Sequence, residues 1–356
     1  MGKQYTPLKI FHFKEKLDSL PNKTEKITSP LHVRLKPTNK CNHNCFYCAY
    51  RVEQLQLGKD MIVKDEIPQE KMKEILNDLI EMNVKSVTFT GGGEPLCYPF
   101  FLNSIKTLAN SPIKFRTYTN GSRLEGEVAE VFAHHGSWMR ISMDGWDDES
   151  YTRYRGIKDK EYTKIMSNLE NFKSLGGNCN LGVSLIIDKK NAGHLFNMIQ
   201  NLKNVGVDSV KVSPCIISNE GEENNKYHEP IFQKVKEQTR KAKGLLSEEN
   251  FEISDSYNKQ LISFEKEHDW CPYIQIRPVI GADLNIYSCQ DKAYNLDSGL
   301  IGSIKNKSFK EFWFSDKNNF FKINPLKDCN HHCVADKENR LILDYLDVDK
   351  NQLEFV

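Results

Sequence analysis

The sequence has no run of roughly 18 apolar residues, the length at which a membrane-spanning helix is indicated. Its N-terminal segment also lacks the apolar core and the cleavage site of a secretory signal peptide. The formal net charge is only +1, which gives no basis for nucleic acid or an anionic membrane surface as a partner. These absences predict a cytoplasmic protein with neither a membrane nor a nucleic-acid partner.

Cysteine, in contrast, is abundant, since the 356 residues include ten. Disulfides are rare in the cytosol, so metal or redox chemistry is the better explanation for these thiols. Seven of them form two groups, Cys41, Cys45 and Cys48 near the start of the chain and Cys271, Cys289, Cys329 and Cys333 near its end. The length predicts either two domains or one large domain with an appendage.

Between the two cysteine groups, short apolar segments alternate with amphipathic ones. The apolar segments, predicted to be strands, are 30–37, 84–90, 113–119, 138–143, 180–188 and 207–217. The amphipathic segments, predicted to be helices, are 68–83, 100–110, 127–136, 164–177 and 194–206. This order predicts an α/β fold with a parallel sheet, right-handed crossovers and a functional site at the carboxyl ends of the strands. The polar motifs of the chain follow four of these strands.

The first cysteine group places three thiols within eight residues, CNHNCFYC at 41–48. A structural zinc site needs four ligands, and His43 would complete a set of three cysteines and one histidine. A 4Fe-4S cluster has four irons, so three thiolates would leave one iron open to another ligand. The spacing alone leaves both interpretations open.

The C-x3-C-x2-C spacing after a strand, with an aromatic residue before the last cysteine, resembles the radical S-adenosylmethionine (SAM) superfamily. The resemblance implies a partial (β/α)6 barrel over roughly residues 30–220 and a 4Fe-4S cluster held by Cys41, Cys45 and Cys48. In that family SAM binds the open iron and is cleaved to a 5'-deoxyadenosyl radical, which abstracts a hydrogen atom from the substrate. A reducing partner such as flavodoxin or ferredoxin is implied as well.

The same resemblance implies a set of SAM-binding residues at the strand ends. TGGGEP is similar to the turn that receives the methionine ammonium, and glycine permits the close backbone approach while a carboxylate pairs with the ammonium. Arg155 stands where many members have an arginine for the SAM carboxylate, with a solvated helix arginine as the alternative. The implied residues are Tyr47, Gly92, Gly93, Glu94, Thr119, Asn120, Ser142, Asp144 and Arg155.

The second cysteine group resembles the C-terminal SPASM and Twitch extensions of that superfamily, which hold auxiliary iron-sulfur clusters. A hairpin is expected between Cys271 and Cys289, followed by a helix with Phe309, Phe312 and Trp313. The chain departs from the SPASM pattern, since only CNHHC is present near the end and Leu284 replaces the usual glycine. Four thiolates suffice for one closed 4Fe-4S cluster, on Cys271, Cys289, Cys329 and Cys333.

Alternatives remain open for the second group and for the single cysteines. Zinc would accept the same four thiolates, and His331 or His332 could replace one of them, while Asp336 or a histidine could enter a cluster. Cys215 ends a strand and is a candidate hydrogen-atom donor to a substrate radical. Cys97, after the glycine turn, is a weaker candidate, and Cys179 is interpreted as incidental.

The expected domains are an N-terminal extension at 1–29, the radical SAM barrel at 30–218, a linker and helix at 219–262, and an auxiliary-cluster domain at 263–356. The expected reaction is oxidation, by dehydrogenation, of a small polar metabolite such as a sugar or nucleotide derivative, because a closed cluster is able to accept an electron. Modification of a ribosomal peptide is the alternative, disfavoured because only 40 residues precede Cys41. A non-catalytic zinc-binding scaffold is the second alternative.

Overall fold

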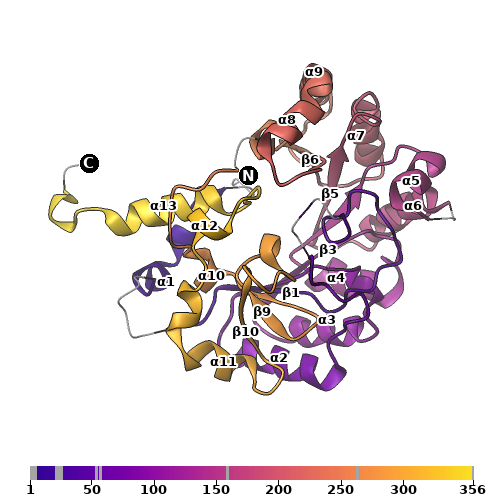
Figure 1. Ribbon diagram of the computed structural model, residues 1–356. Coiled ribbons are helices and arrows are strands. Elements are labelled where there is room, and N and C mark those ends of the chain that lie inside the picture. Colours follow the sequence, from indigo (N-terminus) through magenta and orange to yellow (C-terminus); the bar gives the residue numbers. More distant parts are fainter. Residues whose placement is uncertain are drawn as a thin grey trace.

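A single ten-stranded sheet organises the chain, in the order β10-β9-β8-β1-β2-β3-β4-β5-β6-β7 (Figure 1). The computed structural model describes residues 6–20, 27–52, 55, 58–157, 160–261 and 264–354. Strands β1 to β7 are all parallel, as expected when helices connect consecutive strands. The predicted α/β fold with a parallel (β/α) barrel is therefore confirmed.

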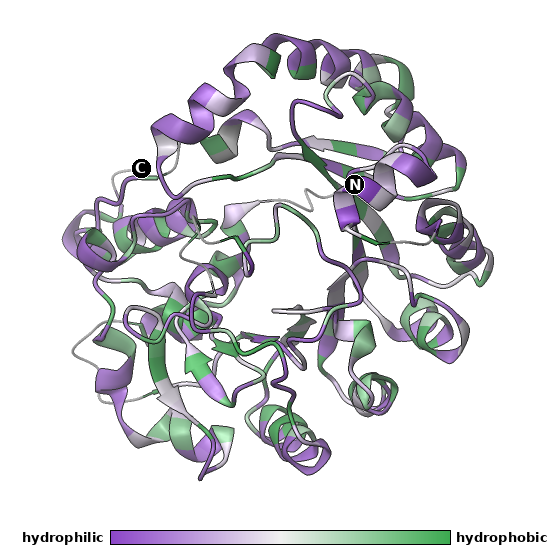
Figure 2. Cartoon of the chain, turned by 45° about the vertical axis from the view of Figure 1, so that its right-hand side comes forward, coloured by the Kyte–Doolittle hydropathy of each residue, from purple (hydrophilic) through white to green (hydrophobic). Residues whose placement is uncertain are grey.

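The parallel strands are β1 (His32–Leu35), β2 (Ser86–Phe89), β3 (Lys114–Thr119), β4 (Trp138–Met143), β5 (Asn180–Ile187), β6 (Ser209–Pro214) and β7 (Glu252–Asp255). Their connecting helices are α2 (Gln69–Glu81), α3 (Phe101–Ala109), α4 (Gly126–His135), α5 (Asp148–Arg155), α6 (Glu161–Ser174), α7 (Leu195–Asn204), α8 (Gly221–His228) and α9 (Phe232–Leu246). A short helix, α1 (Lys14–Asp18), precedes β1. The helices form an arc outside the curved sheet (Figure 2).

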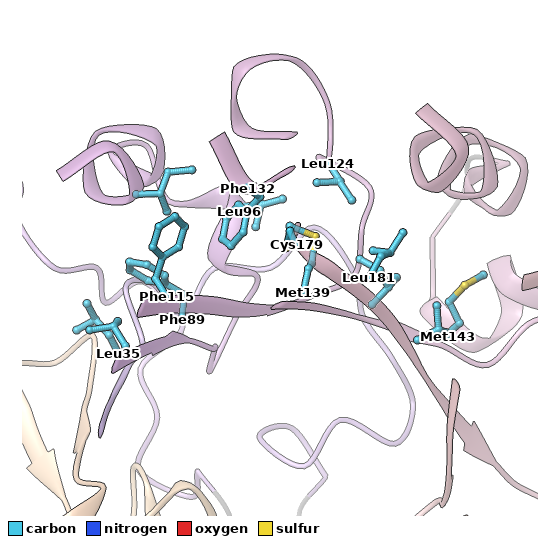
Figure 3. Packing of buried hydrophobic residues seen from close by; sticks show 14 of the residues in the cluster. Leu35, Phe89, Leu96, Phe115, Leu124, Phe132, Met139, Met143, Cys179 and Leu181 are labelled. Atoms are coloured by element: carbon cyan, nitrogen blue, oxygen red, sulfur yellow. The ribbon is translucent and has the colours of Figure 1, made fainter. Parts of the chain in front are cut away.

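Alternation along each strand separates the apolar core from the barrel interior. Leu35, Phe89, Phe115 and Met139 are each almost fully buried and belong to the cluster that packs the helices onto the sheet (Figure 3). Phe132 of α4 meets the ring of Phe115 at 5.2 Å between centroids. Because successive strand residues point to opposite faces, the residues between these apolar positions face the interior of the barrel.

Strand β7 lies within the segment 219–262, which the sequence analysis placed in a linker. It pairs in parallel with β6, matching Ser209 with Glu252 and Val212 with Asp255. Only Ile253 and the preceding Phe251 supply buried apolar side chains there. Four residues with a single apolar position are too short a pattern to distinguish a strand from a turn.

The C-terminal segment continues the sheet on the other side of β1. After α10 (Tyr273–Ile276), β8 (Val279–Ile280) pairs in parallel with β1, and β9 (Asn285–Tyr287) pairs antiparallel with β8. The expected hairpin after Cys271 is thus confirmed. Strand β10 (Leu300–Ser303) and helices α11 (Phe309–Ser315), α12 (Pro325–Asp328) and α13 (Asp336–Asp347) follow.

Leu284 and helix α11 both match the expectations for this segment. Leu284 has a φ of 62°, a left-handed conformation that favours glycine, which explains why related sequences usually place glycine there. Its backbone is held by a hydrogen bond from its N–H to Gly281 O and by one from Ile304 N–H to its carbonyl. Phe312 and Trp313 of α11 are buried, as the helical spacing predicts.

Helix α5, which ends at Arg155, starts with a capping box. The carboxylate of Asp147 accepts a hydrogen bond from Ser150 N at 2.7 Å, and Ser150 Oγ accepts one from Asp147 N at 3.0 Å. These two bonds satisfy backbone donors that the first turn leaves without partners. The hydrogen bonds from Ser150 lower the pKa of Asp147.

The Asp147→Ala variant should lose about 1 kcal/mol of the free energy of unfolding, because the cap is removed. A lowered pKa means that the stabilisation is present above the ordinary value of about 3.9 and is lost only below it, so the loss should be equal at about pH 7 and about pH 5. Urea unfolding at both pH values measures it. Glu149→Ala, at an exposed position of the same turn, should cost less than half as much; equal losses for the two variants would contradict the capping role.

Candidate functional site

Three half-buried thiols lie in the loop that leaves the carboxyl end of β1. Cys41, Cys45 and Cys48 share this loop, and Cys48 N donates to Cys45 O at 3.1 Å. Burial, with the nearby charges of Glu94 and Cys45, raises the pKa of Cys41 to about 12. A metal must therefore displace the proton of this thiol in order to bind it. We refer to residues 38–48 as the cysteine loop.

The glycine turn after β2 is packed directly against the cysteine loop. Gly93 N donates to Thr38 O at 3.2 Å, and Glu94 N donates to Lys40 O at 2.9 Å. A Cβ at Gly93 would lie 2.0 Å from Lys40 O, and one at Gly92 would lie 2.4 Å from the side-chain oxygen of Asn39. The predicted glycines are thus required by the close approach of two backbone segments.

Glu94 connects the glycine turn with the end of β3. Its carboxylate accepts hydrogen bonds from Thr119 Oγ1 at 2.6 Å, Asn120 N at 2.7 Å and Leu96 N at 3.1 Å. Burial raises the pKa of Glu94, and these three hydrogen bonds oppose that rise. A cation beside this carboxylate would offset the cost of burying its charge. The structure therefore brings together Glu94, Thr119 and Asn120, as the sequence analysis expected.

Asp144, at the end of β4, is the centre of a second polar group. Arg155 donates to Asp144 Oδ1 at 3.1 Å, to the carbonyl of Ser142 at 2.5 Å and to Cys45 Sγ at 3.4 Å. Tyr47 donates a short hydrogen bond from its hydroxyl to Asp144 Oδ2. Arg155 is only 3% exposed, so it is not a solvated helix arginine. The cysteine loop, β4 and α5 therefore meet at these side chains.

An aromatic cavity adjoins this second polar group. It has a volume of about 280 Å³ and is lined by Phe46, Trp146, Arg153, Tyr154 and Lys190. Phe46 and Tyr154 immediately precede Tyr47 and Arg155 in the chain. Phe46 is the exposed ring that faces this cavity, and the adenine contact that the family resemblance implies for Tyr47 stays a prediction. Alternating burial in an irregular loop was not predictable from the sequence.

His43, the fourth ligand of the zinc alternative, is held by contacts from Glu161 and Tyr151. His43 Nε2 lies 2.5 Å from Glu161 Oε2, and its ring packs edge-on against Tyr151. Sulfurs that share one tetrahedral zinc lie about 3.8 Å apart, given Zn–S bonds of about 2.3 Å. Among the described residues, the only group of three or more ligand atoms within 4.8 Å of one another is at Cys289, Asp291 and His331. The first three thiols do not form such a group, and His43 Nδ1 has no hydrogen-bond partner among the described residues, so the local geometry leaves both zinc and a cluster open.

The four C-terminal cysteines line one cavity. Cys271, Cys289, Cys329 and Cys333 all border it, together with Asp291 and His331. Asn339 of α13 donates a hydrogen bond to Cys271 Sγ at 3.2 Å. Burial raises the pKa of Cys289, Cys329 and Cys333. Four half-buried thiols around one cavity fit either metal group that the sequence left open, and the ligand set stays a prediction.

Two of the non-cysteine candidates near this cavity differ in their surroundings. His331 is buried, and its Nε2 has no hydrogen-bond partner among the described residues, so this nitrogen is available as a ligand beside Cys289. Asp336 instead pairs with Arg340 at 2.9 Å. The sequence analysis did not consider Asp291. Its carboxylate lies in one group with Cys289 Sγ and a ring nitrogen of His331, all within 4.8 Å of one another.

A chain of polar contacts joins the two cysteine groups, and sequence reasoning missed it. Lys36 is fully buried and donates to Tyr50 OH at 2.7 Å and to Gly91 O at 2.8 Å. The side-chain amide of Gln290, the residue after Cys289, donates to the same hydroxyl. The available signal was a lysine that directly follows β1, two residues before the cysteine loop.

Of the remaining cysteines, Cys97 contacts the cysteine loop, whereas Cys179 and Cys215 are buried elsewhere. Cys215 is 1% exposed, and burial raises the pKa of its thiol to about 12, so it carries its proton at neutral pH. Cys97 Sγ lies 3.5 Å from the side-chain oxygen of Asn42, and Cys179 is buried within the apolar core (Figure 3). The role of Cys215 as a hydrogen-atom donor stays a prediction.

A three-thiol loop at the end of β1, a glycine turn locked onto it and polar strand ends on a parallel barrel define a class of cofactor-binding α/β enzyme. A sequence model of the Radical SAM superfamily matches residues 35–202, which include all of these features. The chain therefore contains a radical SAM domain over these residues. A 4Fe-4S cluster and SAM are the cofactors that this family implies.

Curated relatives share part of the chain. A protein of Archaeoglobus fulgidus without an assigned function is 29% identical over 193 residues, which are 53% of this chain and 43% of that protein. A probable GTP 3',8-cyclase of Thermococcus kodakarensis is 28% identical over 36% of this chain and 40% of its own length. A SAM-dependent nucleotide dehydratase of Lacinutrix mariniflava is 26% identical over 31% and 22%, respectively. The matched regions thus span less than half of the length of each of these relatives.

Solved structures match over most of the chain. The Streptococcus suis SuiB structure with its precursor peptide SuiA has a TM-score of 0.63 at 15% identity, covering 93% of this chain and 78% of SuiB. The structure of anSMEcpe with bound AdoMet has a TM-score of 0.58 at 18% identity, covering 90% and 100%. At these identities the similarity establishes the fold alone. Within the described residues, no helix is long and apolar enough to cross a membrane.

The Gly93→Ala variant should lose the geometry of the cysteine loop, because its Cβ would lie 2.0 Å from the carbonyl oxygen of Lys40. We expect iron incorporation on anaerobic reconstitution to fall by about four atoms, the content of one 4Fe-4S cluster. Gly193→Ala is the matched control, since nothing lies within 4 Å of the added Cβ there. Full iron content in Gly93→Ala would refute the proposed dependence of the loop on this turn.

Proposed function

We propose that this chain holds the SAM-binding 4Fe-4S cluster on Cys41, Cys45 and Cys48 and oxidises a small polar metabolite, such as a sugar or nucleotide derivative. The observation that carries the proposal is the convergence of three thiols with a buried carboxylate, Glu94, and a buried guanidinium, Arg155, at one edge of the barrel. Three thiolates leave one iron of a 4Fe-4S cluster without a protein ligand. An amino acid offers an ammonium and a carboxylate, which match these two side chains in charge.

The residues around the thiols have separate roles in this proposal. Glu94 receives the ammonium of SAM. Thr119 and Asn120 hold the Glu94 carboxylate in place through the hydrogen bonds described above. Asp144 orients Arg155, which also donates to Cys45 Sγ and so connects the guanidinium with the cluster ligands. The aromatic cavity beside Phe46 has a shape and chemistry suited to adenine.

The second half of the proposal concerns the C-terminal cavity. Cys271, Cys289, Cys329 and Cys333 would hold one auxiliary 4Fe-4S cluster, and the hydrogen bond from Asn339 to Cys271 Sγ is of the kind that tunes cluster potentials. When bound, the cofactors supply a radical that removes a hydrogen atom from the substrate and an acceptor for the second electron. Tyr50 and Gln290 join the two thiol groups through hydrogen bonds, which favours electron exchange between them.

This arrangement supports oxidation. Dehydrogenation removes a hydrogen atom, a proton and an electron from the substrate, and the auxiliary cluster would accept the electron. The names of the nucleotide dehydratase and GTP cyclase relatives support a nucleotide derivative as the substrate class. A reducing partner such as flavodoxin or ferredoxin would deliver the initiating electron. A set of free thiols and clusters also fits a reducing cytoplasm. We retain the domains 1–29, 30–218, 219–262 and 263–356 as proposed units.

The two cluster assignments can be separated by iron analysis of single variants. Parent protein reconstituted anaerobically should contain about eight irons and eight sulfides per chain, and Cys45→Ala and Cys289→Ala about four each. Only Cys45→Ala should abolish 5'-deoxyadenosine formation from SAM. Cys179→Ala, in the apolar core, should match the parent in iron content.

Either assignment fails on a specific result. Cys45→Ala with the parent rate of 5'-deoxyadenosine formation would refute the first cluster. Unchanged iron in Cys289→Ala would refute the second, and about four irons plus one zinc in the parent would replace the auxiliary cluster with zinc.

Modification of a peptide, by epimerisation or cross-linking, is the second candidate function. The observations in its favour are the fold shared with SuiB and anSMEcpe, which were solved with a precursor peptide and with peptides, and a buried protonated thiol at Cys215. A thiol of this form can return a hydrogen atom to a substrate radical.

If the reaction is an epimerisation, Cys215→Ala should stop solvent deuterium from entering the product, because the exchangeable S–H is its source. Mass spectrometry of the product in D₂O measures this, with Cys97→Ala as the control thiol. Deuterium incorporation that persists in Cys215→Ala would exclude Cys215 as the donor.

A further inference from the structure

The inner face of the barrel carries a group of cations outside the SAM and cluster sites. Arg34 of β1, Arg116 of β3, Arg140 of β4 and Lys211 of β6 all lie at positions that alternate with the apolar core residues. Each therefore points into the barrel interior rather than toward the helices. We refer to these four residues as the cation group.

The register of the strands places these residues at neighbouring levels. Arg34 and Arg116 both pair with Thr88 of β2, one on each side, and Arg116 Nε donates to Thr88 Oγ1 at 2.6 Å. Strand spacing of about 4.8 Å then separates their backbones by roughly 10 Å across the sheet. A ligand in the interior can reach both side chains at once.

Two aromatic rings hold the guanidinium groups in position. The guanidinium carbon of Arg34 lies 6.0 Å from the ring centroid of Tyr118. Those of Arg116 and Arg140 lie 5.4 and 4.4 Å from the ring of Trp138. The rings of Tyr118 and Trp138 are themselves in edge-to-face contact at 5.3 Å. Arginines fixed over rings lose little freedom on binding an anion.

The charges of the group are not balanced within the described residues. No ion pair joins Arg34, Arg116 or Lys211 to a carboxylate there, and Arg34 Nε has no hydrogen-bond partner although this residue is only 8% exposed. The carboxylates of Asp291 and Glu252 act from a distance on Arg34 and Arg140, respectively. The cations of this face thus outnumber the carboxylates that act on them among the described residues, and buried charges without partners are costly.

The titration behaviour of Tyr118 reports the same positive potential. Burial alone would raise the pKa of its phenol, yet the pKa is lowered because Arg34, Arg116 and Lys211 surround it. Burial and the charge of Arg277 lower the pKa of Arg34 to about 10, although Asp291 and Tyr118 oppose this. Arg277 adds a fifth cation, whose charge also acts on Glu338.

Solvent reaches this inner face. Arg116, Tyr118 and Lys211 are half-buried, while the apolar residues that flank them on the same strands are almost fully buried under the helices. Arg34 stands two residues before Lys36, which is about 7 Å along a strand. Since Lys36 contacts Gly91 of the glycine turn, the cation group lies directly below the cysteine loop. A ligand held there would extend toward the proposed SAM site.

We propose that Arg34, Arg116 and Lys211 bind a phosphate group of the substrate inside the barrel, so that the substrate is a phosphorylated small molecule. A phosphate monoester carries about −1.5 to −2 charge at neutral pH, which offsets more of the excess positive charge than one carboxylate does. Planar guanidinium groups are also the side chains best suited to phosphate oxygens. This inference rests on the proposed function, because it names the substrate class of that site.

The test is a titration of anaerobically reconstituted protein with pyrophosphate at low ionic strength, in the presence of SAM, followed by calorimetry. Parent protein should bind pyrophosphate, and Arg116→Gln and Lys211→Gln should each weaken the binding by about tenfold or more, the usual loss for a charge-assisted hydrogen bond. Arg240→Gln is the matched control, since Arg240 is exposed on α9. It should bind as the parent does.

The outcomes separate this inference from the proposed function. No binding by the parent, or equal binding by parent, Arg116→Gln and Lys211→Gln, would overturn the phosphate site. Tighter binding of citrate than of pyrophosphate would overturn it in favour of a polycarboxylate. The two substitutions keep the inference testable if one of them fails to fold, which thermal unfolding of the same samples detects. The proposed function has its own test, because parent protein that binds pyrophosphate but never cleaves SAM would refute only the radical chemistry.

Discussion

The backbone contact between the cysteine loop and the glycine turn is the constraint on which the rest of the site depends. Gly93 N–H donates to Thr38 O, and the absence of a Cβ at Gly93 is what lets the carbonyl of Lys40 approach. This contact joins the carboxyl ends of β1 and β2 at a fixed distance. It places Glu94 under the hydrogen bonds of Thr119 and Asn120 at the end of β3. The glycine turn therefore holds the ends of three strands in place, and a residue with a side chain could not take the position of Gly93.

Alternation along the strands makes the two faces of the sheet chemically independent. Leu35 and Phe115 bury apolar surface against the helices and stabilise the barrel, whatever occupies the inside. Arg34 and Arg116, one residue away, contribute nothing to that packing and repel each other. Because the packing of the helices on the outer face of the sheet stabilises the fold, the barrel tolerates repulsion between cations on its inner face. An anion held by the cation group, as proposed above, offsets this repulsion.

The sequence predicted the features that depend on local pattern. Strand and helix order, the glycine turn and the polar strand ends at Thr119, Asn120 and Asp144 are each encoded within a few residues. Contacts between distant segments could not be predicted in this way. Tyr50 and Gln290 meet although 240 positions separate them, and β7 is recognisable only by its partner β6. The cation group is an intermediate case. Once the strands and the apolar residues of their outer faces are assigned, alternation along each strand places Arg34, Arg116 and Lys211 on the inner face.

Strand β1 explains why the two thiol groups and the cation group are neighbours. It lies between β2 and β8, with Arg34 opposite Val279 and Leu35 opposite Ile280. Its carboxyl end continues into the cysteine loop, while β8 leads through β9 to Cys289. The C-terminal segment is thus attached through a backbone ladder as well as through contacts of α11 with α2, such as Lys310 N to Asp78 Oδ2 at 2.8 Å. The ladder also brings Gln290 to Tyr50 and Lys36. The pairing of β1 with β8 therefore determines how the C-terminal segment meets the cysteine loop, because a shift of one residue in β8 would turn its alternate side chains to the other face of the sheet.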